Sequence, residues 1–277
     1  MSSKAMSLKA KIRNYAKNEK IAAQVVLQNY MFERFLARLA ISEFKDRFII
    51  KGGMLIAAIV GLNTRSTMDL DATLKGLPLN EVKVLEIIRA IIKIDLGDDV
   101  SFDNISIDSI RKDDPYGGFC VRINAVYDTI ITPLSIDLST GDTITPEAVI
   151  YRLSGLFDED LYFNLWGYNI ETILAEKVET ILSRGVLNTR PRDYYDVYIL
   201  TTSQAYDKLL FKNALNATAE HRNSLRLILD YDVIIDRISK SQELYNMWKK
   251  YQQRFPYAAK IEYEDIIRSL QNLLLNL

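Results

Sequence analysis

The order of strand-like and helix-like segments constrains the fold of this chain most strongly. Three runs rich in β-branched residues follow one another at residues 104–112, 119–128 and 130–139. Such runs, separated by turn residues, are typical of antiparallel strands. After residue 170 the sequence shows helical periodicity and no strand signal of comparable strength. The sequence therefore predicts an α+β fold, in which an α/β domain with a sheet is followed by a helical domain.

This pattern also predicts the domain limits. We expect an N-terminal helical arm at residues 1–44, an α/β domain at 45–165 and a helical domain at 166–277. Residues 141–168 are polar, and we expect an irregular connection there. The other expected strands are 48–53 and 69–74, and the expected helices are 20–42, 54–62, 79–94 with Asn80 as N-cap, 170–185, 192–203, 206–217, 219–238, 240–253 and 260–276.

Composition excludes several classes of protein. The net charge is −1, so the total does not indicate a strongly basic nucleic-acid binder, although a local basic face stays open. The basic residues before residue 21 form either an RNA-contacting arm or a solvated tail. A single cysteine, Cys120, excludes an internal disulfide and fits a reducing compartment. No apolar stretch is long enough to span a membrane, and the polar N-terminus does not resemble a secretory signal, so we expect a cytoplasmic protein.

Two aspartates, Asp69 and Asp71, stand at the start of the expected strand DLDATL. Side chains alternate along a strand, so both carboxylates would point the same way. Neighbouring carboxylates repel, and a divalent cation between them removes that repulsion. Mg²⁺ prefers one or two carboxylates together with substrate phosphates. The pair therefore favours nucleotide chemistry over the alternative, a solvated strand end.

A glycine pair precedes these aspartates. Gly52 and Gly53 follow Lys51 and open the expected helix, so backbone amides and the helix dipole could face a phosphate. The sequence contains neither a P-loop nor a dinucleotide fingerprint, and a simple tight turn is the alternative. The residues expected to bind the nucleotide phosphates here are Lys51, Gly52, Gly53, Arg65, Ser66 and Thr67.

A third carboxylate would complete a two-metal site. Asp137 interrupts the apolar run PLSIDLS, where an acid needs a partner such as a metal. The alternative is a carboxylate on an edge strand that faces water. Asp108, in NISIDSI, is the rival third carboxylate.

Charge is concentrated again in the first expected helices of the C-terminal part. Lys177 lies in AEKVE, and the stretch RPRDYYD contains Arg192, Asp193 and Asp196. A salt-bridged helical surface is the alternative to a functional face. The tyrosines of this stretch either belong to the core or stack on a base.

These motifs together resemble a known family. The segments FIIKGGMLIAAIVGLNTRSTMDLDATL, IDLSTGD and LAEKVETILSRGVLNTRPRDYYDVYIL are similar, in this order, to the AbiEii-type nucleotidyltransferase toxins of type IV toxin–antitoxin systems. The similarity covers about residues 45–203. It implies a polymerase-β-like nucleotidyltransferase fold with a mixed sheet, the cofactors NTP and Mg²⁺, and an RNA (for example a tRNA 3′ end) or a protein as acceptor. A separately encoded antitoxin would oppose the toxin, and the role would be growth arrest or phage defence.

The resemblance also implies residue roles. Asp69 and Asp71 would be the metal-binding pair, and Lys177 would contact the triphosphate. An aspartate of RDYYD, Asp196 or Asp193, would complete the site. Many nucleotidyltransferases have Gly-Ser at the start of the metal motif, which this chain lacks.

Two other functions compete with catalysis. A non-catalytic module with the same fold could bind an RNA or a protein partner. A metal-dependent phosphohydrolase is disfavoured, because such sites commonly use several histidines and this chain has only His221.

Overall fold

The computed structural model of the chain describes residues 3–77, 80–110, 117–158 and 160–275. The chain divides into two compact units. The first, here called the sheet unit, comprises Met1–Asp142 and Val149–Gly167. The second, the helical unit, comprises Thr143–Ala148 and Tyr168–Leu277. The domain limits expected from the sequence stay a prediction.

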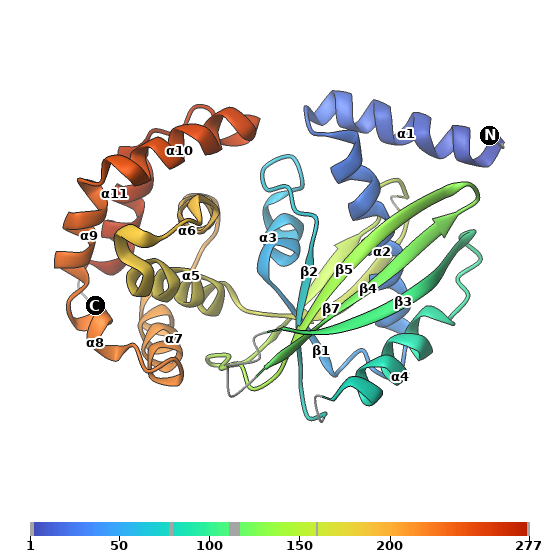
Figure 1. Cartoon of the computed structure of the whole chain (residues 1–277), viewed down its shortest axis with the longest axis horizontal. Coiled ribbons are helices and arrows are strands. Elements are labelled where there is room, and N and C mark those ends of the chain that lie inside the picture. The colour runs from blue at the N-terminus through green and yellow to red at the C-terminus, as the bar shows by residue number, and fades with distance from the viewer. Residues whose placement is uncertain (1–2, 78–79, 111–116, 159, 276–277) are drawn as a thin grey trace. The chain divides into compact units, whose positions relative to one another are not determined.

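One mixed sheet organises the sheet unit. In the described part of the chain its strand order is β3-β4-β5-β2-β1-β7-β6 (Figure 1). The pairs β1/β7 and β2/β5 are parallel, and the other neighbours are antiparallel. The strands are β1 (Phe48–Lys51), β2 (Leu70–Leu74), β3 (Val100–Ile110), β4 (Gly118–Tyr127), β5 (Ile130–Ser139), β6 (Val149–Ser154) and β7 (Tyr162–Gly167).

The three β-branched runs form β3, β4 and β5, which pair antiparallel as predicted. The expected irregular connection at residues 141–168 is wrong, because it contains β6 and β7. β7 pairs with β1, where Ile50 lies opposite Gly167, and β6 pairs with β7. The partner of β7 thus lies about a hundred residues earlier in the chain, and local sequence does not reveal this pairing.

Four helices accompany the sheet: α1 (Ser3–Glu19), α2 (Ala23–Ile41), α3 (Gly52–Val60) and α4 (Glu81–Ile92). α2 packs on β5 and β7, and α4 packs on α2 and β3. The predicted N-cap is confirmed, since Oδ1 of Asn80 accepts a hydrogen bond of 2.9 Å from the amide of Lys83. The N-terminal residues do not form the expected flexible tail, although most of their basic side chains are exposed. Residues 3–19 form α1, whose apolar side chains Leu8 and Ile12 are buried.

The helical unit contains the helices expected after residue 170, with one correction. They are α5 (Ile170–Arg184), α6 (Pro191–Ser203), α7 (Lys208–His221), α8 (Leu225–Leu229), α9 (Tyr231–Ser239), α10 (Gln242–Arg254) and α11 (Tyr263–Leu274). A single helix at 219–238 was expected, but α7 ends at His221 and two short helices follow. Asn223 adopts a left-handed φ of 55°, which breaks a right-handed helix and suits asparagine.

Candidate active site

The aspartate pair lies at the beginning of β2. Asp69 directly precedes the strand and is exposed, while Asp71 is the second strand residue and is half-buried. The flanking residues Leu70 and Ala72 are buried at 1% and 0% exposure. Because side chains alternate along a strand, Asp71 points to the face opposite Leu70 and Ala72. Asp69 lies just outside the strand, so a common side for the two carboxylates stays a prediction.

Strand register places a row of polar side chains across the sheet. Asp71 is the direct neighbour of Lys51 on β1 and of Asp137 on β5. Asp137 in turn lies opposite Cys120, and Cys120 lies opposite Asp108. Direct neighbours on adjacent strands share a face of the sheet. Asp137 is therefore the carboxylate beside Asp71, and Asp108 is two strands farther away.

The two rival carboxylates have different surroundings. β5 lies inside the sheet between β4 and β2, so the alternative that Asp137 sits on an edge strand is wrong. Asp108 lies on the edge strand β3, where it is 59% exposed and forms an ion pair with Arg122. Cys120 is buried, which raises the pKa of its thiol.

The glycine pair lies directly against two side chains, Gly52 against Asp71 and Gly53 against Thr67. Gly52 has φ +65°, and a Cβ atom there would lie 2.1 Å from Oδ2 of Asp71. A Cβ atom on Gly53 would lie 2.8 Å from Oγ1 of Thr67. Both glycines belong to the first turn of α3, whose N-terminal partial charge favours a neighbouring anion. The glycines therefore allow a helix start and a carboxylate to approach more closely than any side chain would permit.

Two side-chain amides of α2 hold the backbone just before Asp69. Nδ2 of Asn29 donates to the carbonyl of Thr67 at 2.8 Å, and Nε2 of Gln28 donates to the carbonyl of Met68 at 2.9 Å. We call Gln28 and Asn29 the amide pair. The sequence did not reveal this contact, because it joins segments about 40 residues apart.

Arg65, expected to bind phosphate, lies in the same loop. It is 1% exposed and donates from Nη1 to the carbonyl of Ser66 at 2.6 Å. Ser66 and Thr67 are also buried. In the structure these three residues build the loop that leads to β2, and their phosphate contacts stay a prediction.

Lys51 belongs to a buried polar network that the sequence analysis missed. Its ammonium forms an ion pair with Asp142 and donates to Oγ of Ser139 at 2.7 Å. Ser139 donates to Asp142 at 2.7 Å, and Thr73 donates to the same carboxylate. Burial alone would raise the pKa of Asp142, but Lys51 and the two hydroxyl donors hold that pKa well below its usual range. The motif IDLSTGD contains this acid, yet only packing shows its partner.

In the helical unit, Lys177 on α5 bridges the two aspartates of α6. Its ammonium lies 2.8 Å from Oδ1 of Asp193 and 2.9 Å from Oδ2 of Asp196. The two side chains are 1% and 0% exposed, respectively. Arg190 also pairs with Asp193, at 2.8 Å. The predicted acids are thus both bound to the predicted lysine, so the geometry favours neither of them.

The tyrosines of RDYYD belong mainly to the core. Tyr194 and Tyr195 are 3% and 1% exposed, and burial raises the pKa of Tyr194. The ring of Tyr195 packs 4.9 Å from that of Tyr257. The expected alternative that these two tyrosines stack on a base is therefore wrong.

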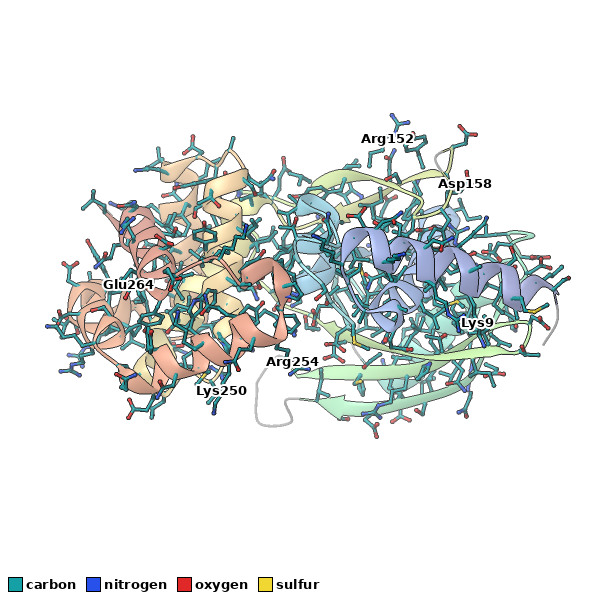
Figure 2. The ribbon with its side chains drawn as sticks, turned by 90° about the horizontal axis from the view of Figure 1, so that it is seen from above. Lys9, Arg152, Asp158, Lys250, Arg254 and Glu264 are labelled. Carbon is teal, nitrogen blue, oxygen red and sulfur yellow. The ribbon has the colours of Figure 1, made fainter. Side chains whose placement is uncertain are left out.

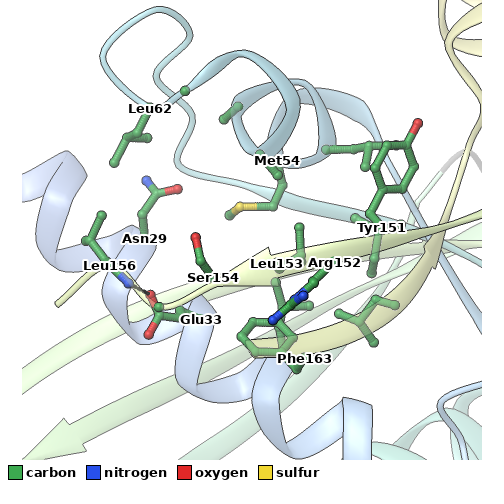
Figure 3. Close-up of a pocket in the computed structure, with 18 of the residues that line it drawn as sticks. Asn29, Glu33, Met54, Leu62, Tyr151, Arg152, Leu153, Ser154, Leu156 and Phe163 are labelled. Carbon is green, nitrogen blue, oxygen red and sulfur yellow. Dashed lines mark hydrogen bonds between the residues drawn. The ribbon is translucent and has the colours of Figure 1, made fainter. Parts of the chain in front are cut away.

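A separate cavity of about 310 Å³ lies in the sheet unit among α2, α3, β6 and β7 (Figure 3). Glu33 faces it but accepts a hydrogen bond of 2.6 Å from the amide of Leu156 and pairs with Arg34. None of the three predicted carboxylates is among the described residues that line this cavity.

The carboxylate oxygens of Asp69, Asp71 and Asp137 are donors of the kind that binds a hard divalent cation. Among the described residues, no group of three or more histidine, cysteine, aspartate or glutamate side chains could hold a metal ion by itself. Mg²⁺ commonly takes only one or two carboxylates and completes its shell with water and substrate phosphates. Asp71 and its strand neighbour Asp137 offer two carboxylates of this kind, and the binding of a metal by Asp69, Asp71 and Asp137 stays a prediction.

Comparison with known proteins identifies the family. The model of the nucleotidyl transferase AbiEii toxin of type IV toxin–antitoxin systems matches residues 34–270. The chain belongs to this family. It is therefore a nucleotidyltransferase of a toxin–antitoxin, abortive-infection class, and membership implies an antitoxin partner. None of the curated proteins matches the chain.

A solved structure supports the nucleotidyltransferase fold. A candidate nucleotidyltransferase from Helicobacter pylori is 17% identical with a TM-score of 0.51, over 92% of this chain and 96% of that one. JHP933 from Helicobacter pylori is 16% identical with a TM-score of 0.49, over 91% of this chain and 93% of that one. The mixed sheet with helices, followed by a helical region, agrees with the fold predicted from the sequence. Within the described residues, no helix is both long and apolar enough to cross a membrane.

Proposed function

We propose that this AbiEii family member transfers a nucleotide from an NTP to an RNA, with Mg²⁺ as the metal and a tRNA 3′ end as the first candidate acceptor. A protein acceptor is the other candidate. One observation carries the proposal: Asp71 has Asp137 as its strand neighbour and the first turn of α3 against its carboxylate. We further propose that the protein acts in the cytoplasm, in phage defence, and that a separately encoded antitoxin opposes it.

The proposed chemistry joins the acceptor hydroxyl to the α-phosphate of the NTP. The oxygen–phosphorus bond forms as the bond to pyrophosphate breaks, and the hydroxyl proton passes to a carboxylate. Asp69 and Asp71 would hold the metal, with Asp137 as the third ligand. When bound, the metal would lower the pKa of the acceptor hydroxyl and offset charge on the leaving pyrophosphate. Asp137 and Asp196 are the two candidates for orienting the acceptor or accepting its proton.

Cationic and backbone groups would bind the triphosphate. We propose that Lys177 contacts it, because the family resemblance assigns this role to the lysine of the EK motif. Glycines at a helix start expose backbone amides that suit a phosphate. The remaining residues of the proposed nucleotide site are Lys51, Gly52, Gly53, Arg65, Ser66, Thr67, Arg192 and Asp193.

Label transfer tests this function directly. The purified chain is incubated with each of the four α-labelled NTPs, Mg²⁺, and either total RNA, tRNA or a protein extract. We expect labelled RNA with the native protein and none with Asp69→Ala, while thermal unfolding shows both proteins folded. Asp108→Asn, an exposed carboxylate on the edge strand, should transfer at the native rate. No label with any NTP and any acceptor would contradict the proposal.

A growth assay separates catalysis from simple binding. Expression of the native chain without an antitoxin should arrest growth, and expression of Asp69→Ala should not. Continued arrest by the folded Asp69→Ala protein would instead support the non-catalytic binding module.

A further inference from the structure

A pocket in the helical unit combines positive charge with aromatic rings. It has a volume of about 450 Å³ and lies between the beginning of α6 and the last turns of α10. We call it the α6/α10 pocket. Its described lining residues are Thr189, Arg190, Pro191, Arg192, Met247, Lys250, Tyr251, Arg254 and Phe255.

All the charged side chains in the described lining of this pocket are positive. Its described lining includes four cationic residues and no carboxylate. Arg190 is paired with Asp193, but within the described residues no carboxylate forms an ion pair with Arg192, Lys250 or Arg254. Lys250 and Arg254 are exposed and lie one turn apart on α10 (Figure 2). Like charges at this spacing repel, so a bound anion would relieve a cost that the free protein carries.

A phenyl ring lies among these cations. The guanidinium carbons of Arg192 and Arg254 lie 5.9 and 5.4 Å from the ring centroid of Phe255. Phe255 is half-buried and packs 4.6 Å from Tyr251 and 5.4 Å from Tyr257, measured between ring centroids. The ring is therefore held in place with cations from two helices beside it. Aromatic platforms flanked by basic residues are typical of proteins that bind single-stranded nucleic acid.

The pocket is connected to the predicted site lysine. Arg190, in the pocket wall, lies 2.8 Å from Oδ2 of Asp193, and Oδ1 of that aspartate lies 2.8 Å from the ammonium of Lys177. Asp193 therefore links Arg190 in the pocket wall to Lys177.

We propose that the α6/α10 pocket binds the acceptor RNA, with one base against Phe255 and phosphates on Arg192, Lys250 and Arg254. This proposal assigns Arg192 to the acceptor RNA in place of the NTP. Cations from two helices beside one ring suit a strand with a phosphate on each side of a base. A phosphorylated peptide would use the cations but would supply no base for the ring. The role as an acceptor site rests on the proposed nucleotidyl transfer to RNA; the binding itself does not.

Fluorescence anisotropy of a labelled single-stranded RNA tests the binding. The full chain is titrated into a mixed-sequence oligonucleotide at several salt concentrations, with EDTA and without NTP. Arg192→Ala and Arg254→Ala should each weaken binding by about fivefold and reduce the salt slope by about one. Phe255→Leu, which keeps an apolar side chain but removes the ring, should weaken binding by about tenfold without changing the salt slope.

Lys249→Ala is the matched control. Lys249 lies on the same helix and carries the same charge, but it pairs with Glu262 and does not line the pocket. Its loss should leave RNA binding within about twofold of the native value. Native binding by Arg192→Ala and Arg254→Ala, or an equal loss with Lys249→Ala, would overturn the proposal.

Two further measurements distinguish a failure of this RNA-binding proposal from a failure of the proposed nucleotidyl transfer. If ATP in EDTA displaces the RNA from the native protein but not from Arg254→Ala, the pocket is a nucleotide site and the proposal is wrong. If the native chain transfers no label to any RNA but binds RNA through the pocket, RNA binding stands and only the proposed transfer fails.

Discussion

A Cβ atom on Gly52 would lie 2.1 Å from Oδ2 of Asp71, closer than atoms of a folded protein approach without bonding. The residue also has φ +65°, a conformation that costs a side chain about 1–3 kcal/mol. Two features therefore require a glycine at position 52: its backbone conformation and its close approach to the carboxylate of Asp71.

We predict that Gly52→Ala displaces Asp71 and reduces nucleotidyl transfer by about 100-fold, because small displacements of reacting groups have large effects on rate. Gly97→Ala is the matched control. Gly97 has the same φ of +65°, but nothing lies within 4 Å of its added Cβ atom. Both variants should lose stability in urea unfolding, and only Gly52→Ala should lose transfer. Equal transfer by the two variants would show that the contact with Asp71 is unimportant.

Two isosteric substitutions can identify which aspartate is the third carboxylate of the proposed metal site. Asp137 is the strand neighbour of Asp71, whereas Asp108 lies on the edge strand beside Arg122. We expect Asp137→Asn to reduce the rate of label transfer by at least about 100-fold, and Asp108→Asn to leave it unchanged. The opposite order of effects would assign the role to Asp108.

The amide pair should act on catalysis by positioning. Gln28→Ala or Asn29→Ala removes a hydrogen bond to the backbone before Asp69 and should cost about 1 kcal/mol of stability. We expect kcat to fall by about tenfold with KM for NTP nearly unchanged. Gln24→Ala, an exposed glutamine on the same helix, is the control and should behave as the native protein. A change in KM alone would contradict the positioning role.

The Lys51–Asp142 ion pair predicts a pH dependence of stability. The pKa of Asp142 is lowered in the folded protein, so its contribution is complete above the unfolded pKa of about 4 and is lost as the pH falls toward the folded value. At pH 7, Asp142→Asn should cost about 3 kcal/mol, because Lys51 stays buried without its partner. Urea unfolding of both proteins from pH 7 to pH 3 should show this difference shrinking below about pH 4. A constant difference would exclude Asp142 ionisation as its source.

Lys177 can be tested for structural and functional roles together. Lys177→Met leaves Asp193 and Asp196 buried without their shared cation and should cost about 3 kcal/mol of stability. The double variant Lys177→Met/Asp196→Asn should regain part of that stability, as thermal unfolding measures. If Lys177 also contacts the triphosphate, label transfer should stay low in the double variant. Recovery of transfer together with stability would leave Lys177 a purely structural residue.

The sequence predicted the features that depend on neighbouring residues. The three β-branched runs predicted β3, β4 and β5, and the strand-like run DLDATL predicted β2. The common orientation of Asp69 and Asp71 stays a prediction. A capping asparagine marked the start of α4. Each of these signals arises within a few residues, so the sequence alone is sufficient.

Features that depend on distant partners were missed. β6 and β7 are strands because β7 pairs with β1, and Asp142 matters because it meets Lys51, 91 residues earlier. The α6/α10 pocket brings together Arg192 and Arg254 from separate helices. Composition showed a nearly neutral chain and could not show where three cations gather.

The hydrogen bonds from Gln28 and Asn29 tie the approach to Asp69 to the interior of the sheet unit, because α2 packs on β5 and β7. Core substitutions under α2 should therefore slow the enzyme before they unfold it. In this toxin, a substitution that loosens the packing of α2 would also misalign Asp69. Variants that no longer arrest growth would therefore arise even from substitutions that touch no reacting group.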